Sequence, residues 1–310
     1  MSWNPKRISA MLRILVLGST TSHAAGGKSM SNGNRINLAM AQIIVEGGKL
    51  PENLARATQA IALAAQQNCH IVVLPECLDL GWTHPSARQS AAEIPGPTSD
   101  VLCRAAAAAG LYVVAGLTER ASGRIYNAAV LIDPHGQLRL KHRKINLLDI
   151  EQELYSIGDC LQVVDTACGT VGLNICADNF PDSLALGHAL ARMGAQMILS
   201  PSAWAVPADH DPAAQPYGAL WEGAYTQLAR LYEMPIVGVS NVGPITAGPW
   251  AGRKCIGCSL AVGPGGEILA KGPYGAEAEQ LIVVEIPLKP RTVAGADIAP
   301  MLRGKGYDGP

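Results

Sequence analysis

Residues 171–178 read Val-Gly-Leu-Asn-Ile-Cys-Ala-Asp, and residues 71–76 read Ile-Val-Val-Leu-Pro-Glu. Each stretch begins as a short apolar run, which is typical of a strand that is buried on both faces of a sheet. Each run ends in a residue with a reactive side chain, Cys176 in the first and Glu76 in the second. The two stretches therefore predict an α/β protein whose reactive groups lie at strand ends.

The rest of the chain alternates between strand and helix patterns. Strands come both as hairpins and in alternation with helices, which favours mixed sheets covered by helices on their outer faces. The predicted helices cover residues 53–67 and 99–109, a segment that begins near Pro181, and residues 217–232. The predicted strands are 36–40, 71–74, 111–117, 125–132, 137–141, 161–165, 170–175, 197–200, 235–240, 256–262, 267–270 and 281–286.

The composition of the 310-residue chain is that of a well-buried enzyme. Apolar residues make up 48% and charged residues 16% of the chain, which argues against a disordered protein. The net charge is −1 and no long basic stripe is present, so we expect neither nucleic acid nor a membrane surface as a partner. The 8 scattered cysteines favour free thiols in a reducing compartment, which predicts a cytoplasmic protein.

The two ends of the chain are expected to lie outside the main domain. Residues 1–34 contain a brief apolar run, Ile14–Leu17, that is shorter than the apolar region of a secretory signal, about 7–15 residues. We predict that this segment is a disordered extension. The domain itself is predicted to span residues 35–287, and the Gly- and Pro-rich tail, 288–310, is predicted to pack on a partner subunit.

Cys176 is a candidate nucleophile because of its place in the chain. A buried strand gives way there to a turn and then to a helix, for which Pro181 is a suitable first residue. Such a turn pushes a side chain out above the sheet edge, as in a nucleophile elbow. The amide of Ala177 near the helix start is then placed to bind an oxyanion. The alternative is that Cys176 is one of several buried, inert cysteines.

Glu76 and Lys144 are the other candidate reactive groups. Glu76 ends a buried strand, where an unpaired charge is costly; the alternative is a glutamate that turns outward to water. Lys144 closes a basic cluster in which Lys141 and Arg143 suit a solvated hairpin end. The apolar residues after Lys144 indicate that the chain turns inward at this point. A carboxylate, an amine and a thiol brought together can hydrolyse an amide.

With these positions in view, the sequence resembles the nitrilase (carbon–nitrogen hydrolase) superfamily across residues 36–287. The Glu-Lys-Cys triad of that family falls on Glu76 in Leu-Pro-Glu, on Lys144 in His-Arg-Lys and on Cys176 in Asn-Ile-Cys-Ala-Asp. Further matching segments, all in order, are Glu93–Thr98, Tyr126-Asn127, Cys255–Ser259 and Pro264–Glu267.

The resemblance implies a fold, an assembly and a chemistry. The fold would be a four-layer α-β-β-α sandwich that forms a homodimer or a higher homo-oligomer. The activity would be hydrolysis of a small linear amide or an N-carbamoyl compound through a cysteine thioester, with release of ammonia and with neither cofactor nor metal. Glu151 matches the second glutamate that family members carry before a Gly-Asp pair, which here is Gly158-Asp159. It would orient Lys144 or the amine.

Two positions bear on the substrate. True nitrilases carry tryptophan directly after the nucleophile, whereas this chain carries Ala177 followed by Asp178, which is closer to the amidase and carbamoylase branches. Many amidases carry tyrosine at that position. By similarity, Trp204 in the segment 200–204 would line the substrate pocket, although simple packing is its alternative role. The proline-rich segment 206–217 is expected to form a loop over the entrance.

Several alternatives stay open or lose support at this stage. A nitrile substrate and a catalytically silent scaffold of the same fold are the competing functions. Cys255-x-x-Cys258 lacks a second pair of ligands, which argues against zinc, and the neighbouring residues of Asp209-His210-Asp211 are not expected to converge on one ion. A papain-like pair would need a histidine near Cys176, but His188 falls within the next helix.

The expected charges around Cys176 predict how its thiol reacts. Two glutamates and one lysine would leave the site with a net negative charge, which disfavours a free thiolate. We therefore predict that Cys176 is not a preformed ion pair and that it reacts chiefly when Glu76 accepts its proton.

Overall fold

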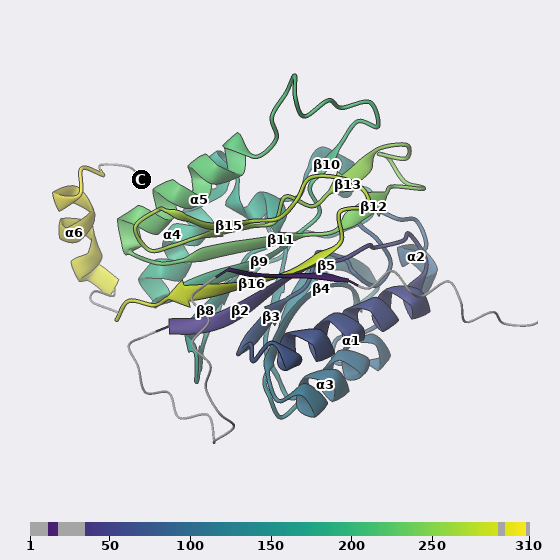
Figure 1. Ribbon diagram of the computed structural model, residues 1–310, viewed down its shortest axis with the longest axis horizontal. Helices are drawn as coiled ribbons and strands as arrows, with labels where there is room; N and C mark the ends of the chain where they lie inside the picture. Colours follow the sequence, from purple (N-terminus) through teal and green to yellow (C-terminus); the bar gives the residue numbers. More distant parts are fainter. Residues whose placement is uncertain (1–11, 18–34, 291–294, 308–310) are drawn as a thin grey trace, which may run out of the picture.

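The structure is a computed structural model that describes residues 12–17, 35–290 and 295–307. Two large sheets pack face to face, and helices cover the outer face of each (Figure 1). The predicted α/β class with α-β-β-α layering is confirmed.

The first sheet has seven strands in the order β1-β16-β2-β3-β4-β5-β6. Parallel pairing joins β2, β3 and β4 at its centre, and antiparallel pairs join β4 to β5 and β5 to β6. The strands are β1 (Arg13–Leu17), β2 (Arg35–Gln42), β3 (Ile71–Val73), β4 (Tyr112–Ala121), β5 (Arg124–Ile132), β6 (Leu138–Arg143) and β16 (Gln280–Pro287).

The second sheet has six strands in the order β15-β14-β11-β9-β8-β7. Its central strands β8, β9 and β11 are parallel. The strands are β7 (Val163–Thr166), β8 (Gly169–Leu173), β9 (Met197–Ser202), β11 (Ile236–Ser240), β14 (Leu260–Val262) and β15 (Ile268–Lys271). A small third sheet joins β10 (Ala205–Val206), β13 (Lys254–Ile256) and β12 (Val242–Pro244).

The helices lie on the outer faces of the sandwich. α1 and α3 lie below the seven-stranded sheet in Figure 1, and α4 and α5 lie above the six-stranded sheet. The helices are α1 (Leu50–Gln66), α2 (Ala87–Ser90), α3 (Pro97–Ala109), α4 (Leu184–Met193), α5 (Ala219–Tyr232) and α6 (Ile298–Gly304). Four 3-10 turns complete the described elements: η2 (Asp149–Glu151), η3 (Cys176–Asn179), η4 (Pro181–Ser183) and η5 (Gly295–Asp297).

Strand β2 shows how the sequence specifies the layers. Leu38 and Met40 belong to the core between the two sheets, whereas Ala39 and Ala41 belong to the core against α1 and α3. This alternation follows from the two-residue period of a strand. On this strand, the small side chains therefore face the helices and the large side chains face the second sheet.

Several local predictions differ from the structure. Residues 13–17 form β1, which pairs in parallel with β16, so this part of the predicted N-terminal extension belongs to the sheet. The other residues of the extension, 1–11 and 18–34, lie outside the described residues. The predicted strand 256–262 is broken because Gly257 and Cys258 both have positive φ, 69° and 60°, and its halves join different sheets.

The helix termini and the tail also differ in detail. Helix α3 is capped at Gly96, and Ser99 accepts the Gly96 N–H at 2.9 Å from within the first turn. α4 begins at Leu184, because Pro181 opens a separate 3-10 turn. In the described part of the tail, Ile298 and Leu302 pack against Leu231 of α5. Packing of this tail on a partner subunit stays a prediction.

Candidate active site

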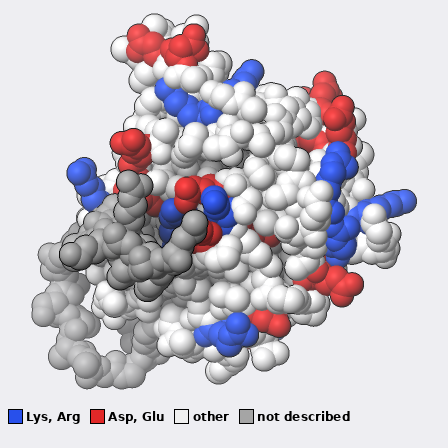
Figure 2. All heavy atoms as spheres, turned by 90° about the vertical axis from the view of Figure 1, so that its right-hand side faces the viewer, with Lys and Arg blue, Asp and Glu red and all other residues white. Residues whose placement is uncertain are grey.

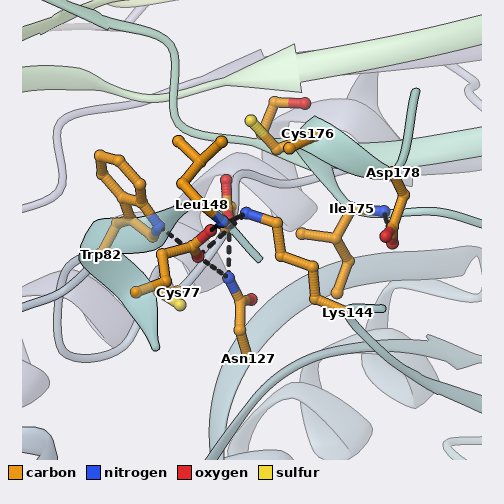
Figure 3. A network of polar contacts seen from close by, with 12 residues as sticks. Cys77, Trp82, Asn127, Lys144, Leu148, Ile175, Cys176 and Asp178 are labelled. Atoms are coloured by element: carbon orange, nitrogen blue, oxygen red, sulfur yellow. Dashed lines mark hydrogen bonds and ion pairs between the residues drawn. The ribbon is translucent and has the colours of Figure 1, made fainter. Parts of the chain in front are cut away.

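Two carboxylates and one ammonium group form a buried cluster of ion pairs near the strand ends (Figure 3). Glu76 follows β3, Lys144 follows β6 and Glu151 ends η2, and all three side chains are fully buried. Lys144 Nζ lies 2.9 Å from Glu76 Oε1 and 2.9 Å from each of Glu151 Oε1 and Oε2. The three N–H groups of the ammonium therefore all have carboxylate partners.

Further donors hold the two carboxylates in place. Trp82 Nε1 donates to Glu151 Oε1 at 2.7 Å, and the Leu148 N–H donates to Oε2 at 2.8 Å. Asn127 Nδ2 donates to Glu76 Oε1 at 2.6 Å and to Glu151 Oε1 at 3.2 Å. Glu76 Oε2 alone of these oxygens is buried without a hydrogen-bond partner among the described residues. One oxygen of Glu76 is thus fixed and the other is available.

Cys176 is held in a strained turn at the end of the second sheet. It is the first residue of η3, three residues after β8 ends at Leu173, and its φ is +44°. Left-handed backbone is unfavourable for any residue with a Cβ, and such strain gathers at functional sites. Ser200 Oγ accepts the Cys176 N–H at 3.2 Å, and the Cys176 side chain is 5% exposed. The geometry is that of the predicted elbow.

Asp178 joins the Cys176 turn to the Lys144 segment. Its Oδ1 accepts the N–H groups of Ile145 and Asn146 at 3.1 and 2.8 Å. Its Oδ2 accepts the Ile175 N–H at 3.0 Å and lies 2.8 Å from His142 Nε2. Because β6 and β8 belong to different sheets, this buried carboxylate fixes the distance between the ends of two sheets.

Burial and the neighbouring charges shift the pKa values of the three groups. Burial raises the pKa of Glu76, although the Lys144 ammonium opposes the change. Burial and the Glu76 carboxylate raise the pKa of the Cys176 thiol well above its ordinary value. Burial alone would lower the pKa of Lys144, but Glu151 and Glu76 raise it well above its ordinary value. At rest, the site therefore contains a neutral Cys176 thiol and a charged Lys144 ammonium group.

A cavity of about 410 Å³ opens over Cys176. Trp204 lies in its wall, and the segment 206–217 contributes His210, Gln215 and Tyr217; a contact of Trp204 with substrate stays a prediction. Ala177 is fully buried and is not among the lining residues; its carbonyl oxygen accepts a hydrogen bond from Asn146 Nδ2 at 2.7 Å.

Several polar contacts in and around this site are not predicted from the sequence. The prediction that Lys141 and Arg143 lie at a solvated hairpin end is wrong, because both pair with the buried Glu119. Trp82 and Asp178 carried no assigned role. Asn127 could have been noticed as a polar residue that opens the apolar run of β5, because a buried amide needs partners.

Other candidate chemistry finds no support in the described residues. No group of three or more His, Cys, Asp or Glu side chains there is placed to hold a metal ion. None of the 8 cysteines, which all lie within the described residues, forms a disulfide bond. Among the described helices, none has the length and apolar character to cross a membrane. On the face drawn in Figure 2, Lys and Arg side chains lie interspersed with Asp and Glu.

The comparison with known sequences decides the family. The family model described as carbon–nitrogen hydrolase matches residues 37–293. The chain belongs to the carbon–nitrogen hydrolases. Omega-amidase NIT2-B of Xenopus laevis is 32% identical over 270 residues, covering 82% of this chain and 90% of that protein. A protein of Pyrococcus abyssi named nitrilase is 33% identical over 244 residues, covering 76% of this chain and 84% of its own length.

Solved structures agree on the fold. The crystal structure of a carbon–nitrogen hydrolase from Helicobacter pylori G27 superimposes with a TM-score of 0.74. The alignment covers 88% of this chain and 94% of that one at 22% sequence identity. This carbon–nitrogen hydrolase therefore has the fold that its sequence family implies, with its buried Glu-Lys-Glu cluster beside the cysteine turn.

Proposed function

We propose that this carbon–nitrogen hydrolase cleaves a small linear amide or N-carbamoyl compound through a thioester on Cys176 and releases ammonia. The family and the amidase named among its relatives support C–N hydrolysis. The observation that carries the residue roles is the unpartnered, buried Oε2 of Glu76, next to an oxygen that Lys144 and Asn127 hold. A fixed carboxylate with one free oxygen suits a general base.

In the first half of the reaction, Glu76 Oε2 takes the thiol proton as the Cys176 sulfur bonds to the carbonyl carbon. The carbonyl electron pair moves to oxygen, where the Ala177 amide and Lys144 stabilise the negative charge. The tetrahedral intermediate then collapses. The C–N bond breaks, and Glu76 returns its proton to the nitrogen, so that ammonia leaves and an acyl thioester remains.

In the second half, water replaces ammonia. Glu76 removes one proton from the water as its oxygen bonds to the thioester carbon. The C–S bond breaks, the acid product forms, and the sulfur takes back a proton. Glu76 thus accepts and returns a proton twice in each cycle.

Lys144 can serve the oxyanion only by exchanging a contact, because all its N–H groups bind carboxylate oxygens at rest. When Glu76 accepts the thiol proton, its charge is neutralised and its attraction for Lys144 weakens. One N–H of Lys144 then becomes available as negative charge develops on the substrate oxygen. Glu151 keeps its two contacts and positions the ammonium.

The test combines turnover with trapping of the intermediate. Purified protein is incubated with a panel of linear amides, N-carbamoyl compounds and matched nitriles, and ammonia and acid are measured. We expect ammonia from amides and an acyl adduct on Cys176 by mass spectrometry, both absent in Cys176→Ala. Acid from nitriles but not from amides would favour the nitrilase alternative, which the Pyrococcus abyssi relative brings forward. No turnover with an unreactive Cys176 would favour a silent scaffold.

A further inference from the structure

Four tryptophans and the phenylalanine of this chain lie together in the lining of the cavity over Cys176. The whole chain has five tryptophans and one phenylalanine. Trp82, Trp204, Trp221, Trp250 and Phe180 all line this cavity. Aromatic residues make up only 5% of the sequence, so this concentration sets the character of the site.

These rings form a packed wall. The ring of Trp204 stacks on that of Trp221 with centroids 4.9 Å apart and an interplanar angle of 22°. Phe180 lies 5.1 Å from Trp221. On another part of the lining, Trp82 meets Trp250 edge to face at 5.1 Å. Rings in mutual contact have few alternative rotamers, so the cavity is preorganised for an apolar group.

Charged partners for a substrate are missing from the lining. No Lys, Arg, Asp or Glu is among the described residues that line the cavity. His210 is the one lining residue able to carry a positive charge, and its Nδ1 is hydrogen-bonded to Tyr274 Oη at 2.8 Å. Beneath Cys176, Glu76 and Glu151 outnumber Lys144, which leaves a net negative charge.

We propose that the acyl group of the substrate is uncharged and apolar, with a flat aromatic or medium-length aliphatic chain. This inference rests on the proposed amide hydrolysis at Cys176. A substrate carboxylate would lose its water without gaining a cationic partner, and the two glutamates would repel it. An ammonium group would also lose its water and would find no carboxylate among the described lining residues, and contact with aromatic faces offsets only part of this cost. A neutral chain has no charge to strip of water, and it gains from burial of apolar surface. A cavity of about 410 Å³ lies within the range of small-molecule sites.

The test compares amides of matched length and different charge. Hexanamide is neutral, adipamate carries a terminal carboxylate, 6-aminohexanamide carries a terminal ammonium, and 4-phenylbutanamide carries a neutral ring. We expect kcat/KM for both charged amides to be on the order of 100-fold below that of hexanamide, with 4-phenylbutanamide at least equal to hexanamide. A charged amide that comes within tenfold of hexanamide overturns the proposal.

Leu220 offers a pair of matched variants. It lines the cavity near the start of α5 and is 47% exposed, so a charged side chain can replace it without entering the core. Leu220→Lys should raise the ratio of adipamate to hexanamide kcat/KM by about 3- to 10-fold, and Leu220→Glu should lower it. Equal ratios in both variants would show that the acyl group does not lie against this wall and would overturn the proposal.

A binding assay separates this inference from the proposed reaction. In Glu76→Gln protein, the four amides compete with iodoacetamide for access to Cys176, and mass spectrometry measures the protection. Protection by hexanamide and not by adipamate supports the neutral pocket even if no amide is turned over. Turnover of amides with protection by adipamate as strong as by hexanamide overturns the pocket and leaves the reaction intact.

Discussion

Replacement of Glu76 by glutamine should lower turnover strongly and at the same time make the Cys176 thiol more acidic. The variant keeps the Oε1 acceptor that binds Lys144 and Asn127 and places its new amide group at the unpartnered position. The fold and the local hydrogen bonds should therefore survive. What the protein loses is a proton acceptor and one negative charge beside the thiol.

The size of the effect follows from Coulomb's law. A unit charge roughly 5 Å away, at an effective dielectric constant of about 20, contributes about 3 kcal/mol, which corresponds to a pKa change of about 2. Loss of the Glu76 charge should lower the pKa of Cys176 by this amount. Iodoacetamide alkylates the free thiolate, whereas attack on an amide needs proton transfer to Glu76, so at pH values well above the pKa of Glu76 the variant should react with iodoacetamide about 100-fold faster. Turnover should fall by about 10²- to 10⁴-fold, the usual contribution of a general base.

The pH profile gives the sharper reading. Below the raised pKa of Glu76 the wild-type carboxyl is neutral, so the alkylation rates of wild type and variant should coincide. Above this pKa, the alkylation rate of wild type should rise less with pH than that of the variant, because the ionised Glu76 disfavours loss of the thiol proton from Cys176. Peptide mass spectrometry follows Cys176, and the exposed Cys160 serves as a reference thiol in the same sample.

Two results would refute this reasoning. If Glu76→Gln reacts more slowly than wild type at about pH 8, the carboxylate does not suppress the thiolate. If wild-type Cys176 already reaches a fast plateau at acidic pH, the thiol belongs to a preformed ion pair.

Three further changes test the scaffold of the site. Asp178→Asn should lower kcat by tenfold or more and lower the free energy of unfolding in urea by about 2–4 kcal/mol. The reason is that both carboxylate oxygens accept buried N–H groups, and one of them becomes an NH₂ donor in the variant. An unchanged kcat would contradict a positioning role for Asp178. Gly116→Ala should cost about 1–3 kcal/mol and most of the activity, since its Cβ would lie 2.5 Å from Glu76 Cα, whereas Gly223→Ala, with open space around it, should be neutral or stabilising. Burial would raise the pKa of Glu119, but hydrogen bonds from Arg143 and Lys141 lower it overall. Its stabilising contribution should thus be complete above its ordinary pKa and lost as pH falls through the lowered one, so wild type and Glu119→Gln should differ more in unfolding free energy at pH 7 than at pH 3.

The sequence was sufficient to place the three candidate reactive residues after strand ends. Glu76 and Cys176 each end an apolar run, and Lys144 precedes one, so local patterns place all three at strand ends. The hydrogen-bond partners could not be found in this way. Trp82 and Asn127 reach Glu151 from segments far away in the chain, and only the packing of β3, β5 and η2 brings them together.

Edges and breaks were harder to predict for a different reason. Strand β1 is short, and Ile14 and Val16 are 40% and 49% exposed, so no burial pattern marks it. The break at Gly257 and Cys258 depends on positive φ values. A residue with a side chain, such as Cys258, rarely adopts a positive φ, so the sequence does not predict one there. The local sequence therefore predicts one continuous strand, whereas tertiary packing divides it into two.

The proposed reactive groups come from opposite halves of the sandwich, and this has a consequence for folding. β3 and β6 of one sheet carry Glu76 and Lys144, and β8 of the other carries Cys176. A species in which only one half is ordered would have a base without a nucleophile, or the reverse. Recovery of enzymatic activity during renaturation would therefore time the moment at which the two halves dock.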